Sequence, residues 1–255
     1  MTDTKSVQNA VRCGGGLSYR VNGVDLLQNI ELELKRGQLH AVIGENGAGK
    51  TTLLDVLARD VEPSSGWVKY RERPISEFSV AELALRRAYL RQHHALEFGF
   101  RAIEVIRLGR LPFGPDSQIV DQVVTALALK DLCHRDYTTL SGGEKQRVQI
   151  ARVLTQVWQA EDMICLLDEP LTGLDFRHQF LLMKLLRELA SRGLTIVMVM
   201  HDLRIAARYA DQLVLLEHGQ LLERGQPSKV LTEKNLQRVF GTSSLEVFSD
   251  AEMQT

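Results

Sequence analysis

A glycine-rich segment, residues 44–51 (GENGAGKT), fits the G-x-x-x-x-G-K-[ST] pattern of a phosphate-binding loop. Glycines let such a loop turn tightly, so that successive backbone N–H groups point at phosphate oxygens. A helix predicted to begin near Lys50 adds the positive end of its dipole. Lys50 is therefore a candidate ligand of the β- and γ-phosphates, and the hydroxyl of Thr51 is a candidate ligand of Mg²⁺. The whole candidate nucleotide-binding segment is Gly44, Glu45, Asn46, Gly47, Ala48, Gly49, Lys50, Thr51 and Thr52.

Two carboxylates, Asp168 and Glu169, directly follow the apolar run Ile164 to Leu167. The run predicts a buried strand, and α/β sheets bind ligands at the carboxyl ends of their strands. Asp168 is predicted to hold Mg²⁺, and Glu169 is placed to polarise an attacking water as a general base, a role worth about 10²–10⁴ in rate. Capping of a following helix would explain an isolated acidic pair as often. The phosphate loop in the same chain favours the catalytic interpretation.

The string Leu140, Ser141, Gly142, Gly143, Glu144 precedes a long amphipathic helix, predicted over Glu144 to Trp158. Ser141 is predicted to cap this helix, whose first N–H groups would form a second anion site. Because the chain has two helix starts that can bind phosphate, we infer that one binds the nucleotide held by its own chain and the other binds the nucleotide held by a partner chain.

The elements that must position these residues follow from hydrophobic spacing. Alternation of Ile30, Leu32 and Leu34 with glutamates predicts a half-buried strand. Apolar runs predict further strands over residues 39–43, 67–70, 164–167 and 195–200, and a hairpin that turns at residues 218–219. Residues 80–158 have helical spacing, and residues 176–192 predict another helix that stops at Gly193. The expected class is α/β, with a mostly parallel sheet, a strand-rich N-terminal region and a helical insert.

Composition excludes several classes of protein. The 255 residues include 31 Lys and Arg against 32 Asp and Glu, for a net charge of −1, which argues against a general nucleic-acid binder. The apolar runs are far shorter than the roughly 20 residues of a membrane-spanning helix. Three scattered cysteines predict neither a disulfide framework nor a zinc site.

Taken in order, the phosphate loop, Gln92, LSGGE, ICLLDEP, LTGLD and His201 resemble the nucleotide-binding subunit of ATP-binding cassette (ABC) transporters. The resemblance covers nearly the whole chain and implies the ABC form of the P-loop NTPase fold, with an N-terminal antiparallel β-subdomain. It implies a single ATP-binding domain over residues 1–255, with a core of residues 1–92 and 159–255 and a helical subdomain of residues 93–158. In this family two cassettes form a head-to-tail dimer, with ATP between one phosphate loop and the other LSGGE.

The resemblance also implies roles for single residues. Tyr19 lies where the family stacks an aromatic ring on adenine, and Gln92 would sense Mg²⁺ and the γ-phosphate. His201 would hold the γ-phosphate, and Asp175 would contact the partner chain. Many relatives have Ser-Ala-Leu-Asp where this chain has residues 172–175 (TGLD). The implied catalytic set is Glu169, His201 and Gln92, the implied Mg²⁺ set is Thr51, Gln92 and Asp168, and the set facing the partner's ATP is Leu140, Ser141, Gly142, Gly143 and Glu144.

Residues 105–114 (VIRLGRLPFG) look like a segment of the cassettes that serve importers of haem, ferric siderophores and cobalamin, and residues 83–92 and 135–158 are similar to haem-importer ATPases. This implies a homodimer that docks peripherally under two membrane permease subunits, at the cytoplasmic face of the inner membrane. A periplasmic binding protein would deliver the cargo, and the helical insert would form the groove for the permease. Three alternatives stay open: a siderophore or cobalamin importer, a cytosolic ABC ATPase such as one for iron–sulfur cluster assembly, and a P-loop kinase or regulatory module.

Overall fold

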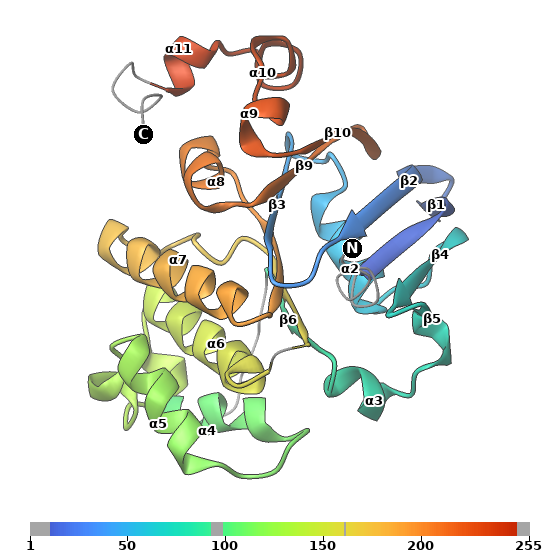
Figure 1. Cartoon of the computed structure of the whole chain (residues 1–255). Coiled ribbons are helices and arrows are strands. Elements are labelled where there is room, and N and C mark those ends of the chain that lie inside the picture. Colours follow the sequence, from blue (N-terminus) through green and yellow to red (C-terminus); the bar gives the residue numbers. More distant parts are fainter. Residues whose placement is uncertain (1–10, 93–98, 161, 249–255) are drawn as a thin grey trace, which may run out of the picture. The chain divides into compact units, whose positions relative to one another are not determined.

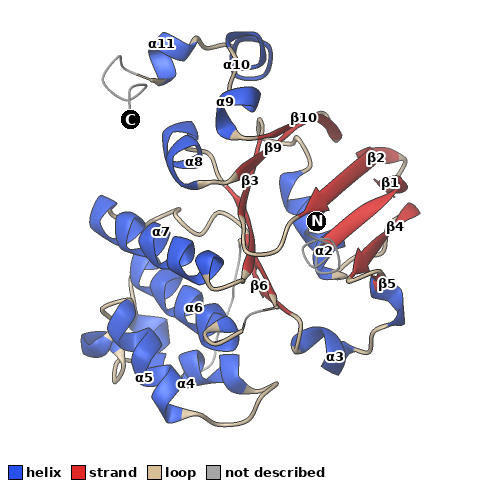
Figure 2. Ribbon diagram, in the orientation of Figure 1, coloured by secondary structure: helices blue, strands red, loops and turns tan. Residues whose placement is uncertain are grey.

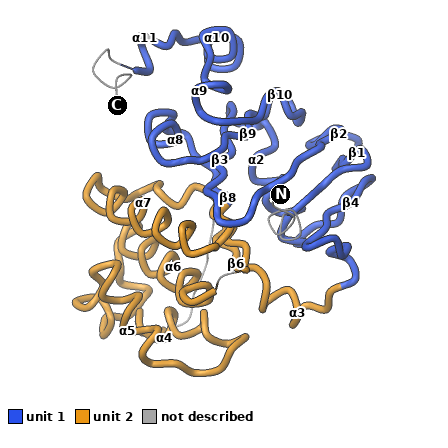
Figure 3. The backbone as a smooth tube through the Cα atoms, viewed as in Figure 1, with its two compact units in different colours: residues 1–77, 197–255 blue, residues 78–196 orange. Residues whose placement is uncertain are grey.

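Residues 11–92, 99–160 and 162–248 are described by the computed structural model of the chain (Figure 1). The chain forms two compact units (Figure 3). Unit 1 comprises residues 1–77 and 197–255, and unit 2 comprises residues 78–196. The first residues of the predicted helical subdomain, 93–98, lie outside the described part of the chain, and the division at residues 92 and 159 stays a prediction.

An antiparallel sheet occupies the N-terminal part of unit 1, with strand order β2-β1-β4-β5. Its burial follows the predicted alternation, because Ile30, Leu32 and Leu34 are buried while Glu31 is exposed. The N-terminal strand-rich region is therefore confirmed. The strands are β1 (Val11–Val21), β2 (Val24–Leu34), β4 (Ser65–Tyr70) and β5 (Arg73–Pro74).

A second group of strands in unit 1 leads to the phosphate loop. The fully buried strand β3 (Leu39–Ile43) pairs in parallel with β9 (Gln212–Glu217), which pairs antiparallel with β10 (Gln220–Gly225). The strands β9 and β10 form the predicted hairpin, with positive φ angles of 48° and 79° at His218 and Gly219. Two successive positive φ angles are the signature of the tight hairpin turn that matches strand twist.

The helices of unit 1 have well-defined ends. The Asp202 carboxylate accepts from the N–H groups of Arg204 and Ile205 at the start of α8, and α10 ends at Gly241 with a φ of 63°. These helices are α2 (Lys50–Ala58), α8 (Leu203–Tyr209), α9 (Pro227–Val230), α10 (Glu233–Phe240) and α11 (Ser244–Val247).

In unit 2, the buried strands β6 (Arg87–Leu90) and β7 (Ile164–Leu167) pair in parallel. The predicted strand over residues 164–167 has the observed bounds. Strand β8 (Thr195–Val199) crosses the boundary between the units and ends one residue before the predicted end.

The helices of unit 2 centre on α6 (Gly142–Val157), which packs against α4 and α5. This helix begins two residues before the predicted start, because Ser141 caps it and both glycines already lie in the first turn. The others are α3 (Val80–Ala84), α4 (Ala102–Arg107), α5 (Ser117–Ala126) and α7 (Phe176–Ser191).

Both units contain helices and strands (Figure 2), and parallel pairs occur in each, β3–β9 in unit 1 and β6–β7 in unit 2. The predicted α/β class is therefore confirmed. Within the described residues, every helix is too short or too polar to cross a lipid bilayer.

Candidate active site

The predicted phosphate loop connects β3 to α2 in unit 1. The backbone N–H of Ala48 donates to the carbonyl oxygen of Glu45 at 3.2 Å, which closes the loop into a tight turn. Helix α2 begins at Lys50 after Gly49, a residue with no side chain to occupy the first N–H groups of the helix. The first turn of α2 can therefore present its N–H groups to an anion.

Two glycines of the loop cannot be replaced without strain. Gly44 has a φ of 149°, and a Cβ atom there would lie 2.3 Å from the carbonyl oxygen of Leu216. Gly49 has a φ of 95°, and a Cβ atom there would lie 2.6 Å from the carbonyl oxygen of Leu26. The loop thus needs glycine both for its backbone conformation and for its close approach to β2 and β9.

The Lys50 side chain is buried, at 6% exposure, and its ammonium folds back onto the loop. Its Nζ atom donates to the carbonyl oxygens of Gly44 and Glu45, at 2.8 Å each. The ammonium thus lies within the turn where a bound phosphate would need positive charge. In the first turn of α2, Thr51 is exposed and Thr52 is half-buried.

The β9–β10 turn contacts the loop from the far end of the sequence. The N–H of Gly219 donates to the carbonyl oxygen of Ala48 at 3.1 Å, and the carbonyl oxygen of Gly219 accepts from the N–H of Gln28 at 2.8 Å. Gly219 therefore joins the phosphate loop to β2. The sequence predicted the hairpin but gave no signal for this bond, because the two segments lie far apart along the chain.

Two further predicted residues lie in unit 1. Tyr19 is half-buried in β1 and pairs across the sheet with Leu27 of β2. His201 is exposed, two residues after the end of β8 and directly before Asp202, the cap of α8.

The predicted catalytic carboxylates follow β7 in unit 2. Asp168 is fully buried, and its N–H donates to the carbonyl oxygen of Leu90 in β6 at 2.9 Å. Glu169 is half-buried with a φ of 48°, an uncommon conformation for a residue with a side chain. The hydroxyl of Thr172 donates to its Oε2 atom at 3.3 Å. A strained residue held by its surroundings at a strand end is typical of a functional site.

The LSGGE segment forms a capping box at the start of α6. The N–H of Glu144 donates to Ser141 Oγ at 3.3 Å, and the N–H of Ser141 donates to Glu144 Oε2 at 2.8 Å. These bonds, with a hydrogen bond from Arg135 at 2.7 Å, lower the pKa of the Glu144 carboxyl. The predicted cap is confirmed. Ser141 and Gly142 are exposed while Leu140 is buried, so the helix start is open to a ligand.

A close approach explains the second glycine of this segment. A Cβ atom at Gly143 would lie 2.6 Å from the carbonyl oxygen of Gly173. Residues 170–175, the segment between Glu169 and α7, therefore pack directly on the start of α6. Gly173 itself has a φ of 77°, which suits the glycine where many relatives have alanine. Gln92 is exposed, two residues after β6, at the last described position before residues 93–98.

The structure thus places Tyr19, the phosphate loop and His201 in unit 1, and Gln92, LSGGE, Asp168, Glu169 and Asp175 in unit 2. Each unit carries a helix start suited to an anion, α2 in one and α6 in the other. Oxygen donors for a hard cation are present at Thr51, Gln92 and Asp168.

Comparison with known proteins identifies the family. The ABC transporter family model matches residues 27–172. The chain is 43% identical over 225 residues to the hemin import ATP-binding protein HmuV of Hahella chejuensis, and the match covers 86% of this chain and 88% of the relative. It is 39% identical over 244 residues to the protein of the same name from Aliivibrio fischeri, with 94% of each chain covered.

A solved structure described as a metal-chelate type ABC transporter in an inward-facing conformation superposes with a TM-score of 0.75. Its sequence identity is 27%, and the match covers 92% of this chain and 90% of the other. The phosphate loop, the strand-end carboxylates and LSGGE fall within the residues that the ABC transporter family model matches. The chain therefore belongs to the ABC transporter family, as an ATP-binding and ATP-hydrolysing subunit.

Proposed function

We propose that this chain is the energy-coupling ATPase of an import complex whose cargo is hemin. The observation that carries the cargo is the name shared by relatives that are 43% and 39% identical over most of the chain, hemin import ATP-binding protein. Cargo contacts would belong to other subunits, so the work of this chain is to bind and hydrolyse ATP.

Lys50 and α2 would bind the phosphates of ATP. The ammonium already lies at the carbonyl oxygens of Gly44 and Glu45, so it can exchange them for phosphate oxygens with a small movement. The N–H groups of the loop and of the first turn of α2 add neutral donors and the helix dipole. Tyr19 would stack on the adenine from β1.

The oxygen donors of Thr51, Gln92 and Asp168 fit Mg²⁺, which prefers oxygen ligands and keeps several waters. When bound, Mg²⁺ would neutralise charge on the phosphates. Asp168 directly follows the buried strand β7, and α/β sheets bind ligands at such strand ends, which supports this role.

Glu169 would accept a proton from the attacking water. Its unusual φ of 48° and the bond from the Thr172 hydroxyl hold the carboxylate directly after the β7 strand end. His201 and Gln92 would contact the γ-phosphate and complete the catalytic set. Catalysis then consists mainly of positioning and charge stabilisation, as is general for phosphoryl transfer.

Two copies of the chain would form the active enzyme. The exposed start of α6, with Ser141 as its cap, would bind the phosphates of ATP held by the loop of the other copy. Leu140, Gly142, Gly143 and Glu144 would support this contact, and the exposed Asp175 would face the partner.

A permease would dock on the helical part of unit 2, with two permease subunits for the dimer. A cavity of about 400 Å³ lies between α4 and α5; Leu111 in its lining is 77% exposed, and Phe113, adjacent in sequence to the lining residue Gly114, is 42% exposed. We take these exposed apolar side chains as part of the surface that a permease would cover. The cavity is lined by Arg107, Arg110, Leu111, Gly114, Pro115, Asp116, Ser117 and Val120.

Docking on a permease would place the chain peripherally at the cytoplasmic face of the inner membrane, with a periplasmic binding protein acting indirectly. A second cargo class, a ferric siderophore or cobalamin, is favoured by the metal-chelate type transporter that shares the fold. The two are distinguished in proteoliposomes that contain the chain and its permease. We expect hemin on its binding protein to stimulate ATP hydrolysis, and stimulation by a ferric siderophore or cobalamin alone would contradict the hemin assignment.

The chemistry is tested by Glu169→Gln. We expect this variant to bind ATP and to dimerise, while its hydrolysis rate falls by about 10²–10⁴ because the base is absent. Glu188→Gln, which changes an exposed glutamate on α7, is the matched control and should hydrolyse ATP like the original chain. Hydrolysis by Glu169→Gln at the original rate would show that another group is the base.

A further inference from the structure

His178 in the first turn of α7 bonds to two charged side chains. Its Nε2 atom lies 2.9 Å from the guanidinium NH1 of Arg147 on α6. Its Nδ1 atom lies 2.8 Å from Asp175 Oδ1, directly before α7. The imidazole is mostly buried, with 23% of its side chain exposed. The side chains of Arg147, His178 and Asp175 thus form a continuous relay from α6, which begins within LSGGE, to the residue before α7.

The chemistry of the relay fixes the protonation of His178. A guanidinium can only donate hydrogen bonds, so the Nε2 atom of His178 must accept from Arg147 and carry no proton. The single ring proton therefore resides on Nδ1, which donates to the carboxylate of Asp175. A second proton on the ring would remove the acceptor for Arg147 and place two cations in contact.

Asp175 accepts a second bond on the same oxygen. The backbone N–H of His178 donates to Asp175 Oδ1 at 2.9 Å, which makes Asp175 the cap of α7. This backbone bond and the imidazole bond lower the pKa of the Asp175 carboxyl, so the group is ionised at neutral pH. Its side chain is 65% exposed, so the carboxylate can also accept from another molecule.

The backbone around Asp175 is held by other contacts. Gln146 Nε2 on α6 donates to the carbonyl oxygen of Pro170 at 3.3 Å, and Gln179 Nε2 donates to that of Leu174 at 3.1 Å. The close approach of Gly143 to Gly173 adds a second contact with α6. Loss of the His178 imidazole would therefore leave the segment in place and the cap of α7 intact, because the cap uses a backbone N–H.

We propose that His178 is a positioning residue, which aims the Asp175 carboxylate at the second copy of the chain and ties its orientation to α6. The inference rests on the proposed dimer and deepens it. Ser141 caps α6, so the relay links the helix that would bind the partner's ATP to the carboxylate that would contact the partner, and a shift of one would move the other.

Three variants separate the two hydrogen bonds of the His178 imidazole, one to Arg147 and one to Asp175. Each is made together with Glu169→Gln so that ATP is not consumed. His178→Ala removes both hydrogen bonds. His178→Asn keeps a donor near the Nδ1 position, and His178→Gln keeps an acceptor near the Nε2 position. His134→Ala, at an exposed histidine of the same unit, is the matched control.

Light scattering would measure the ATP concentration at which half of the chains are dimeric. We expect His178→Ala to raise it about fivefold, less than the roughly tenfold or more that one hydrogen bond to a charged group contributes, because the Asp175 carboxylate is misaligned and not removed. His178→Asn and His178→Gln should each recover part of the loss, and His134→Ala should match the Glu169→Gln parent. Thermal melting would show the His178 variants folded like the parent.

The outcomes distinguish the relay from the dimer on which it rests. Equal half-dimerisation concentrations for the parent and His178→Ala, or no recovery in His178→Asn and His178→Gln, would overturn the relay while leaving the dimer standing. A Glu169→Gln parent that stays monomeric at saturating ATP would overturn the proposed dimer, and the relay with it.

Discussion

The Nζ atom of Lys50 lies 2.8 Å from the carbonyl oxygen of Gly44, at the first residue of the loop that the lysine completes. The ammonium is thus already enclosed by backbone oxygens and largely removed from water. A phosphate that replaces these oxygens meets a charge that has already lost most of its hydration. The loop is therefore organised for an anion before the anion arrives.

We predict that Lys50→Ala weakens ATP binding by at least about tenfold, because hydrogen bonds to charged groups contribute about 1.5–3 kcal/mol. Calorimetric titration with ATP measures the change. Lys234→Ala, which removes an exposed lysine at the start of α10, should bind ATP as before. Retained affinity in Lys50→Ala would refute the role given to the loop lysine.

A second prediction concerns Gly219, whose N–H bonds to the loop at Ala48. A Cβ atom at Gly219 would lie 2.7 Å from the carbonyl oxygen of Leu26, at a φ of 79°. Gly219→Ala should lower the free energy of unfolding by more than the ~1–2 kcal/mol of a left-handed alanine, and should weaken ATP binding. Gly241→Ala is the control, because Gly241 has a similar φ of 63° but a Cβ atom there would meet open space. Its loss of stability therefore measures the cost of the left-handed backbone alone. Equal losses in both variants, measured by chemical denaturation, would show that crowding at Gly219 has no effect.

A third prediction separates capping from nucleotide chemistry. Ser141 caps α6 and Asp116 caps α5, each by accepting a backbone N–H in the first turn. Replacing either by alanine should lower the free energy of unfolding by about 1 kcal/mol. Only Ser141→Ala should also reduce ATP hydrolysis, because only α6 is proposed to bind ATP. A similar loss of activity in Asp116→Ala would point to stability as the cause.

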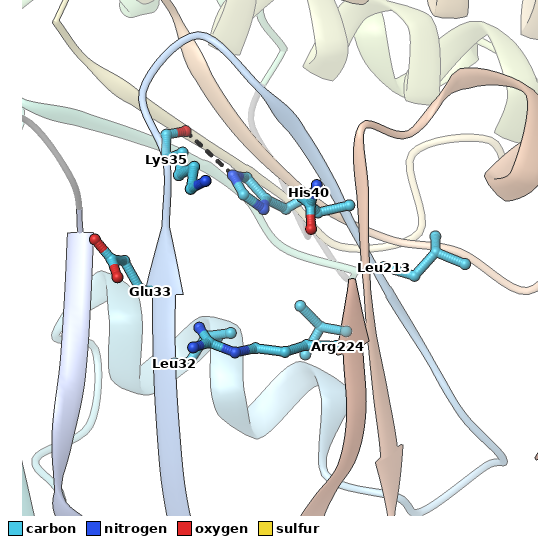
Figure 4. Close-up of a pocket in the computed structure, with 8 residues that line it drawn as sticks. Leu32, Glu33, Lys35, His40, Leu213 and Arg224 are labelled. Carbon is cyan, nitrogen blue, oxygen red and sulfur yellow. Dashed lines mark hydrogen bonds between the residues drawn. The ribbon is translucent and has the colours of Figure 1, made fainter. Parts of the chain in front are cut away.

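A cavity of about 330 Å³ in unit 1 borders a buried histidine (Figure 4). His40 on β3 is 1% exposed, and its Nε2 atom lies 3.1 Å from the carbonyl oxygen of Lys35. Burial lowers the pKa of His40 from 6.5 to about 4, against the opposing effects of this hydrogen bond and of Asp211. The folded chain therefore holds His40 neutral at pH values where the unfolded chain protonates it.

The fourth prediction follows from this difference in protonation. Between about pH 6.5 and about pH 4 the unfolded state binds more protons, so stability falls as pH is lowered through this window. The loss from His40 should reach about 2 kcal/mol between about pH 7 and about pH 5. Chemical denaturation at the two pH values should show a smaller difference for His40→Gln than for His134→Gln, which changes an exposed histidine. Equal pH dependence in the two variants would contradict the buried neutral His40.

Local patterns were sufficient for much of the fold. The buried strand over residues 164–167 was predicted with its observed bounds, because an apolar run that ends in two carboxylates has clear limits. The predicted start of α6 is two residues late. Glycine is unfavourable inside a helix, so the sequence pattern assigns Gly142 and Gly143 to the preceding loop, but with Ser141 as the cap both glycines lie in the first turn. Motifs of fixed spacing also identified the candidate site residues, whose catalytic roles stay predictions.

Contacts between distant segments could not be predicted. The bonds of Gly219 to Ala48 and Gln28 depend on the register of three strands, and no local pattern encodes that register. The positive φ of Glu169 is equally hidden, since glutamate has no preference for it and the surrounding structure imposes it. The relay through His178 emerges only when α6 and α7 are packed side by side.

The β9–β10 turn also bears on how this chain can be engineered. A short exposed hairpin turn is normally a favourable place to insert a tag, a fluorescent reporter or new termini. Here the turn is bonded to Ala48 on one side and to Gln28 on the other, so an insertion at residues 218–219 would disturb the nucleotide loop directly. The turn at Asn22 and Gly23 between β1 and β2, where a Cβ atom on the glycine would meet open space, is the better site for a reporter.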